Sequence, residues 1–282
     1  MYQWKQLSPS VHHRLDLGLA FGMTDTGLVR PSNEDNFLID AQLGLVAVAD
    51  GMGGHEAGEV ASADALIAIA HFLRTKLDNR GDPEVVNFKP SHGAAPAPDS
   101  AADPVGAAVD TMHNAVDFAN QRMYQTNLSN RRGDGGGMGT TLTGIWQPQA
   151  QGPVYLFHVG DSRLYRYRDG QLTQTTHDQT LYQQAIDDGA TVDLPPRNLL
   201  LQALGPSFDV EPELQVLDVA PGEILLLCSD GLFGASSDAR IAAVLAEASE
   251  DKLDTCCQQL IDNAKRDGSR DNITAVLIQC RW

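Results

Sequence analysis

The chain has 282 residues, of which 42% are hydrophobic and 20% charged, and its formal net charge is −17. This composition predicts a soluble globular protein with a sizeable core, and no apolar run is long enough to span a membrane. The negative charge argues against nucleic acid or a membrane surface as partner, although bound cations would still allow a phosphorylated substrate.

The first half of the chain predicts strands at 16–23, 37–40 and 44–49 and amphipathic helices at 56–76 and 105–128. Between the helices, residues 78–104 hold five prolines among Ala, Ser, Asp and Gly, which predicts a flexible surface insertion. The alternative is a second domain boundary in this segment, but the same alternation of predicted strands and helices continues beyond it. We favour a tether without a function of its own.

The second half begins with a glycine-rich loop at 131–139, a weak phosphate-loop signal because no Lys-Ser/Thr pair follows it. A short helix is expected at 178–187, an irregular segment at 188–205, and helices at 238–248 and 252–265. The expected strands are 140–146, 153–159, 164–167, 171–173, 214–219, 224–228 and 273–280. Strands in hairpin-connected runs and helices in pairs predict one α+β layered domain over 1–282, with antiparallel sheets.

The cysteines lack the spacing of a zinc site. Cys228 and Cys280 lie in apolar runs, where a free thiol behaves as a small hydrophobe. The N-terminal residues also lack the apolar region of a signal peptide. We therefore expect a reduced, cytoplasmic setting.

The run 44–54 ends abruptly on Asp50, followed by Gly51, Met52 and two further glycines. A buried strand that ends on a carboxylate beside bare backbone lets a ligand reach both the side chain and main-chain carbonyls. Taken alone, the motif is more typical of an ordinary Asp-Gly turn.

The same pattern recurs elsewhere in the chain. Further carboxylates stand at the ends of predicted strands, at Glu34, Asp161, Asp230 and Asp271. Adjacent strands would bring such carboxylates to one edge, where they repel one another unless a cation lies among them. Oxygen ligands suit Mg²⁺ or Mn²⁺, so we expect a divalent metal site; a solvated acidic rim is the alternative.

These residues belong to an ordered series of short motifs: 29–35 (VRPSNED), 48–54 (VADGMGG), 139–141 (GTT), 159–163 (VGDSR), 203–205 (ALG), 229–232 (SDGL) and 271–274 (DNIT). Each motif is weak alone. Together, from about residue 18 to residue 280, the series resembles in order that of PP2C-type (PPM) protein serine/threonine phosphatases of bacteria.

The resemblance implies an α/β/β/α sandwich, with two antiparallel sheets flanked by helix pairs and a core of about 16–281. It also implies two Mn²⁺ or Mg²⁺ ions. Asp50 resembles the aspartate that bridges both ions, and Gly51 resembles the residue whose carbonyl binds the first. Asp230 and Asp271 resemble ligands of the second ion.

Three other positions carry over from the family. Glu34 resembles the acidic residue that holds metal-bound water, and Asp161 matches an aspartate that, with Asp230, binds a weaker third ion in some members. Arg30 resembles the phosphate-binding arginine; a surface ion pair is its alternative. Asp35 is expected to orient Arg30 or a metal-bound water.

The implied reaction is direct attack on phosphorus by a hydroxide that bridges the two ions. Ions about 3.5–4 Å apart make such a hydroxide available near neutral pH. Arg30 and the metals would stabilise charge on the equatorial oxygens. Because no enzyme nucleophile is needed, Ser162 and Ser229 are expected to be turn and packing residues.

The proton donor for the leaving group is the open point. Some family members carry a His after the Asp-Gly pair, whereas this chain has Met52, as similar bacterial members do. A metal-bound water near Asp161 or Asp230 is one candidate. His55 is more typical of a surface loop and His158 of a structural residue, while His177 is a candidate for touching substrate.

Residues 178–205 resemble the flap beside the active site, a segment expected to influence substrate choice. The leading hypothesis is a metal-dependent phosphatase that acts as a monomer on phosphoserine and phosphothreonine in targets of a Ser/Thr kinase. The alternatives are a catalytically silent PP2C-like phosphoprotein-binding or regulatory module, a small-molecule phosphatase, and a SpoIIE-like regulatory phosphatase acting on an anti-sigma-factor antagonist.

Overall fold

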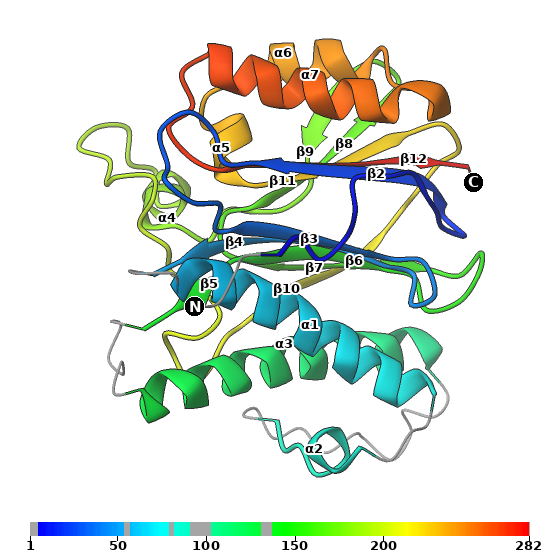
Figure 1. The fold of residues 1–282 in the computed structure, drawn as a ribbon, viewed down its shortest axis with the longest axis vertical. Coiled ribbons are helices and arrows are strands. Elements are labelled where there is room, and N and C mark those ends of the chain that lie inside the picture. Colours follow the sequence, from blue (N-terminus) through cyan, green and yellow to red (C-terminus); the bar gives the residue numbers. More distant parts are fainter. Residues whose placement is uncertain (1–4, 54–56, 79–81, 91–102, 131–136, 282) are drawn as a thin grey trace.

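The computed structural model describes residues 5–53, 57–78, 82–90, 103–130 and 137–281. Two antiparallel sheets lie face to face, and helices cover the outer face of each, giving four layers (Figure 1). This is the α/β/β/α arrangement that the sequence predicts. Within the described residues, no helix combines the length and apolar character needed to cross a membrane.

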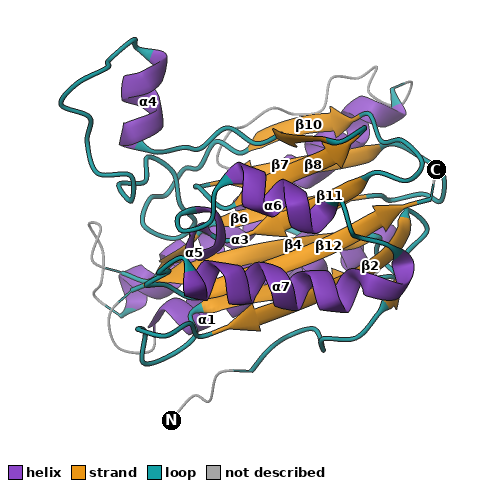
Figure 2. Cartoon of the chain, turned by 90° about the horizontal axis from the view of Figure 1, so that it is seen from above, coloured by secondary structure: helices purple, strands orange, loops and turns teal. Residues whose placement is uncertain are grey.

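The first sheet joins strands from both ends of the chain. Its order is β1 (His13–Arg14), β2 (Gly18–Asp25), β12 (Ile273–Cys280), β11 (Ile224–Cys228), β8 (Arg163–Arg168) and β9 (Gln171–Gln174). Helices α6 (Asp238–Leu245) and α7 (Leu253–Arg266) lie across its outer face (Figure 2).

The second sheet is built from the middle of the chain. Its order is β10 (Glu213–Leu217), β7 (Val154–Val159), β6 (Leu142–Trp146), β4 (Leu45–Met52) and β3 (Asp35–Asp40), and β5 (Gly139–Thr140) pairs with the end of β4. The long helices α1 (Ala57–Leu77) and α3 (Pro104–Ser129) pack beneath it.

The central strands are apolar along their whole length because both faces of each sheet are covered. In β11 all five residues are buried. Alternate side chains enter either the layer between the sheets, such as Leu225 and Leu227, or the layer under α6 and α7, such as Leu226. The continuous apolar runs in the sequence therefore reflect strands buried on both sides.

The expected helices and strands are present, with ends shifted by a few residues. Four short elements were not predicted: β1, α5 (Asp230–Phe233), the 3₁₀ turn Glu250–Lys252, and α2 (Pro83–Val86). The helix expected at 178–187 is confined to α4 (Leu181–Asp187), because Thr180 caps it by accepting from the Gln183 N–H at 3.0 Å.

The expectation of a flexible surface insertion at 78–104 does not hold for residues 82–90. Val85 is buried in the cluster under the second sheet. The Phe88 ring lies edge-on to Phe72 and Phe118, with centroid distances of 6.0 and 5.3 Å. The apolar side chains of Val85 and Phe88 thus anchor residues 82–90 of this proline-rich segment to α1 and α3. Residues 79–81 and 91–102 of the insertion lie outside the described residues, as do 131–136 of the glycine-rich loop.

Strand ends from both sheets meet at one edge of the sandwich, on the left in Figure 1. Asp35 and Asp50 are paired across β3 and β4 in the second sheet. In the first sheet, β11 ends just before Asp230, and β12 begins just after Asp271 and Asn272. Helices α4 and α5 lie at the same edge in both ribbon views.

Candidate active site

A pocket of about 270 Å³ opens at this edge. All seven residues named from the sequence as site residues contribute to its wall, although they lie up to 241 positions apart in the chain. The full lining is Arg30, Glu34, Asp50, Gly51, Met52, Gly53, Thr141, Asp161, Asn198, Leu200, Asp230 and Asp271.

Hydrogen bonds of its backbone N–H and carbonyl hold Asp50 in place near the end of β4. Its N–H donates to Thr141 Oγ1 at 3.0 Å, and its carbonyl accepts from the Thr141 N–H and from Thr140 Oγ1, both at 2.9 Å. These bonds fix the main chain and leave the carboxylate to face the pocket. The GTT motif at 139–141, to which sequence reasoning gave no role, therefore positions Asp50.

Gly51 is required by close packing. A Cβ atom at this position would lie 2.0 Å from the Gly58 carbonyl oxygen and 2.6 Å from that of Glu34. A Cβ at Gly58 would in turn lie 2.7 Å from the Glu34 carboxyl carbon. The two glycines let α1 and the Glu34 segment close against the end of β4, which sets Glu34 beside Asp50.

Asn272 ties residues 26–34, the loop that carries Arg30 and Glu34, to the first sheet. Its Oδ1 accepts from the Glu34 N–H at 2.8 Å, and its Nδ2 donates to the carbonyls of Thr26 and Ser32 at 2.9 and 2.8 Å. This side chain bridges a gap of more than 230 positions between the segments carrying Glu34 and Asp271. Its bridging role is a further one that the sequence alone did not reveal.

Asp35 lies below the pocket and does not line it. Its Oδ2 accepts hydrogen bonds from Ser229 Oγ and Thr274 Oγ1, each at 2.6 Å, linking β3 to β11 and β12. The structure thus gives Asp35 a bridging role between the two sheets, in place of the expected orientation of Arg30. It also makes Ser229 a packing residue, as predicted.

Arg30 reaches across the pocket to a carboxylate. Its Nη2 lies 2.6 Å from Asp271 Oδ2, and the two side chains are 47% and 32% exposed. This hydrogen bond, followed by the charges of Asp271, Glu34 and Asp50, outweighs burial and raises the pKa of Arg30. The guanidinium is therefore charged and stands at the mouth of the acidic pocket.

Burial is the first reason why the carboxylates of the pocket hold their protons more tightly than free carboxyls. Burial and the neighbouring charge of Asp230 raise the pKa of Asp161 to about 7. Burial and the charge of Asp271 raise the pKa of Asp230 to about 6, and burial followed by the charge of Asp35 raises the pKa of Asp50 well above its ordinary value. The site therefore gathers negative charge that its surroundings do not neutralise.

The donor set fits a hard divalent cation. Asp230 Oδ1 is buried, and no described residue donates a hydrogen bond to it, although an unsatisfied buried carboxylate oxygen is costly. The neighbouring ligand atoms are carboxylate and carbonyl oxygens, the type that Mg²⁺ and Mn²⁺ prefer. A cation at Asp271 would share that carboxylate with Arg30 or displace the guanidinium from it.

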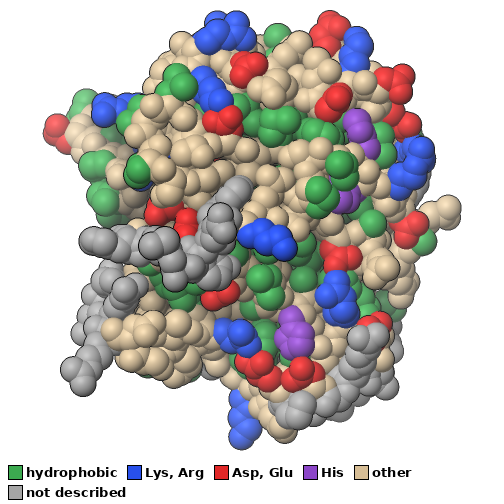
Figure 3. Space-filling view, viewed as in Figure 1, with side chains coloured by type: hydrophobic (Ala, Val, Ile, Leu, Met, Phe, Trp, Pro, Cys, Tyr) green, Lys and Arg blue, Asp and Glu red, His purple; other side chains and the backbone are tan. Residues whose placement is uncertain are grey.

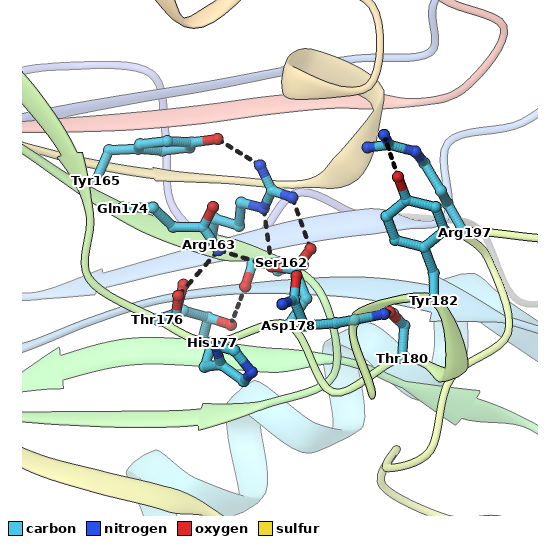
Figure 4. Close-up of polar contacts among 12 residues, drawn as sticks. Ser162, Arg163, Tyr165, Gln174, Thr176, His177, Asp178, Thr180, Tyr182 and Arg197 are labelled. Carbon is cyan, nitrogen blue, oxygen red and sulfur yellow. Dashed lines mark hydrogen bonds and ion pairs between the residues drawn. The ribbon is translucent and has the colours of Figure 1, made fainter. Parts of the chain in front are cut away.

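One wall of the pocket comes from residues 178–205, the expected flap. Arg163 anchors the start of this segment by donating from Nε and Nη2 to the two carboxylate oxygens of Asp178, at 2.8 and 2.6 Å (Figure 4). The guanidinium also stacks 3.7 Å from the centroid of the Phe233 ring. Further along, Asn198 and Leu200 reach the pocket.

The histidines are not at the centre of the pocket. His158 is buried, with Nδ1 2.8 Å from Thr143 Oγ1 and Nε2 3.0 Å from the His177 carbonyl, and burial lowers its pKa. It is therefore structural, as predicted. His177 pairs with Asp187 at 2.6 Å and does not line the pocket, so its proposed contact with substrate is not supported. His55 lies outside the described residues.

Ser162 lies in the turn between β7 and β8. Its Oγ lies 2.7 Å from Thr141 Oγ1, and it is fully buried. The serine therefore supports the residue that positions Asp50, in agreement with the packing role expected for it.

A sequence model of the family described as protein phosphatase 2C matches residues 31–277. The chain belongs to the protein phosphatase 2C family. It is 39% identical over 261 residues to the serine/threonine protein phosphatase PstP of Mycobacterium tuberculosis, covering 90% of this chain and 43% of PstP. The chain thus spans less than half the length of that relative.

A second family member and the solved catalytic domain of PstP are matched over most of their length. The serine/threonine phosphatase stp of Listeria innocua is 30% identical over 264 residues, covering 91% of this chain and 93% of stp. A crystal structure of the PstP catalytic domain with two manganese ions superposes with a TM-score of 0.71 at 34% identity, covering 93% of this chain and 98% of that one. The 2C phosphatase resemblance inferred from the motifs is confirmed.

Proposed function

We propose that this chain is a metal-dependent protein phosphatase that hydrolyses phosphoserine and phosphothreonine. The observation that carries the proposal is the pocket at the sheet edge, where five acidic side chains and one arginine converge from segments far apart in the chain. The naming of its 2C relatives as serine/threonine phosphatases supports the same activity.

Two Mn²⁺ or Mg²⁺ ions are the proposed cofactor, in line with the two manganese ions in the PstP structure. Asp50, the Gly51 carbonyl, Asp230 and Asp271 would hold them, and Glu34 would hold metal-bound water. Asp161 would hold a weaker third ion together with Asp230. When bound, the ions supply a deprotonated water near neutral pH and neutralise charge on the phosphoryl group.

The chain's own residues place the substrate against this centre. Arg30 is charged and half exposed at the mouth of the pocket, so its guanidinium can donate to phosphate oxygens in the fork geometry that favours Arg for phosphate. Because it already bonds to Asp271, it is pre-oriented towards the position of the reacting phosphoryl group. The flap residues Asn198 and Leu200 close one side of the pocket and limit access of bulk water.

Proton transfer to the leaving serine or threonine oxygen needs a group that carries a proton near neutral pH. Met52 lines the pocket and cannot supply one. Asp161 and Asp230 line the pocket, but as metal ligands they would carry their charge when the ions are bound, so neither carboxyl holds this proton. We propose that a water beside Asp161 or Asp230 delivers it.

The experiment is hydrolysis of a phosphoserine peptide with Mn²⁺, with EDTA and with metal restored. We expect turnover that EDTA abolishes and Mn²⁺ restores, and a loss of at least about a thousandfold in Asp50→Asn. Asp209→Asn, in an exposed loop, is the matched control with the same change of charge. Binding of the phosphopeptide without turnover by the wild type would instead support the silent module, and metal-independent turnover would refute the proposal.

The expected partners follow from the same proposal. Phosphorylated proteins, targets of a Ser/Thr kinase, are the proposed substrates, and we propose that the chain acts in the cytoplasm as a monomer. Comparison of phosphoproteomes with and without the enzyme would identify the substrates, and sedimentation would test the monomer.

A further inference from the structure

A second hollow adjoins the proposed catalytic pocket. It measures about 380 Å³, larger than the catalytic pocket, and lies between α5 and the loop that joins α7 to β12. The two hollows share Asp230 and Asp271, so a substrate bound at the metal centre has this space directly beside its phosphorylated residue. The remaining lining of the second hollow is Gly231, Gly234, Ala235, Asp267, Gly268, Ser269 and Arg270.

Arg270 is the unusual member of this second hollow. Charged side chains of both signs are intermixed on the face shown in Figure 3, and many described arginines are in ion pairs, such as Arg122 with Glu84 and Arg168 with Glu223. Arg270 is exposed, and within the described part of the chain it has no hydrogen bond or ion pair. Its guanidinium is free to bind a ligand.

The other charges of the hollow already have partners. Asp267 Oδ2 lies 3.3 Å from Arg240 Nε and accepts from Ser236 Oγ at 3.0 Å. Asp271 is bonded to Arg30, and Asp230 belongs to the proposed metal centre. The charge left to select a ligand is therefore the positive charge of Arg270.

We infer that Arg270 selects phosphoprotein segments that carry an acidic side chain near the phosphorylated residue. The inference rests on the proposed phosphatase function. A carboxylate, or a second phosphate, in this hollow would accept two parallel hydrogen bonds from the guanidinium. In a chain with a net charge of −17, such a contact also offsets the repulsion that an acidic segment meets on approach.

The test compares phosphoserine peptides that differ at one position. A neutral parent peptide is varied by placing Asp, Asn or Lys at each of the four positions on either side of the phosphoserine. For the wild type with Mn²⁺ we expect one or two positions at which Asp raises kcat/KM about two- to tenfold over Asn, mainly through KM. The advantage should shrink in high salt, because the pair is exposed.

Two variants connect this preference to Arg270. Arg270→Gln should bring the Asp-to-Asn ratio of kcat/KM close to one, and Arg270→Glu should reverse the preference in favour of Lys. Arg266→Gln is the matched control: it removes the same charge from the end of α7 but does not line the hollow, and it should keep the wild-type ratio.

The outcomes separate this inference from the proposed function. If wild type hydrolyses the neutral peptide but shows no acidic preference at any position, the role of Arg270 is refuted and the phosphatase proposal stands. The same holds if Arg270→Gln keeps the wild-type ratio, or if Arg266→Gln loses it equally. If wild type with Mn²⁺ hydrolyses none of the peptides, the phosphatase proposal itself fails.

Discussion

Replacing Asp230 by Asn should stabilise the metal-free protein while weakening its response to metal. The Asp230 carboxylate is buried, its Oδ1 has no donor among the described residues, and its pKa is raised to about 6 by burial and then by Asp271. In the unfolded chain the carboxyl would have an ordinary pKa of about 3.9. The charge on Asp230 therefore destabilises the folded state, and an uncharged amide at the same place avoids this cost.

The sign and size follow from linkage. At pH values below about 4 both states hold the proton; as the pH rises, the unfolded state releases it first, so the metal-free wild type loses stability until the pH passes about 6. A shift of about two pKa units corresponds to about 3 kcal/mol at most, and an imperfectly bonded amide offsets part of it. We expect a net gain of about 1–3 kcal/mol for Asp230→Asn at pH 8, or about 3–8 °C in Tm.

Thermal unfolding of both proteins in EDTA at pH 8, pH 5 and pH 4 measures this effect, with Asp209→Asn as the exposed control. The gain should be fully present at pH 8, about half as large at pH 5 and small at pH 4, where the carboxyl keeps its proton in most folded molecules and in about half of the unfolded ones. Mn²⁺ at a hundred times its Kd should stabilise the wild type by about 2.7 kcal/mol and the variant much less, reversing their order. A variant less stable than wild type in EDTA at pH 8 would refute the electrostatic reasoning.

Three further substitutions test other parts of the site and fold. Arg30→Ala should lower kcat/KM for a phosphopeptide about ten- to a hundredfold because a charge-assisted contact to phosphate is lost, and Arg30→Lys should restore part of it, as measured by steady-state kinetics. Asp178→Ala should cost about 2–4 kcal/mol in urea unfolding because it leaves the largely buried Arg163 guanidinium without its carboxylate partner; a cost below about 1 kcal/mol would contradict the anchoring role. Phe88→Ala should cost about 2 kcal/mol if the insertion packs on α1 and α3 as described, and an unchanged Tm would contradict that packing.

The layered fold could be predicted because its strands and helices are long and strongly patterned. Apolar runs that end on turn residues gave the central strands, and the order of hairpins and helix pairs gave the class. The short elements could not be predicted in the same way. Helix α2 lies among prolines, and it is held by the burial of Val85 and by Phe88 stacking on residues distant in sequence, contacts that no local pattern reveals.

The acidic residues of the site were visible in the sequence because each stands at one end of an apolar strand, either just before it begins or where it stops. What the sequence did not reveal is the hydrogen bonding that gathers them. Asn272 and Thr141 look like ordinary strand-end residues, yet each bonds to a segment more than 90 positions away. Asp35, next to Glu34 in sequence, points to the opposite side of its strand, so it bridges the sheets instead of joining Arg30.

Two requirements conflict at this edge of the sandwich: the carboxylates lie close together, and their burial there disfavours their charged forms. Asp50 and Asp230 both line the pocket, and their burial, together with the charge of neighbouring carboxylates such as Asp35 and Asp271, penalises their ionised forms in the metal-free state. Hydrogen bonds made by the uncharged residues Thr140, Thr141 and Asn272 compensate, because they fix the backbone without adding charge. A site of this kind keeps its shape by polar bonds to the main chain and leaves its carboxylates under-satisfied, so cation binding and retention of the folded state are favoured together.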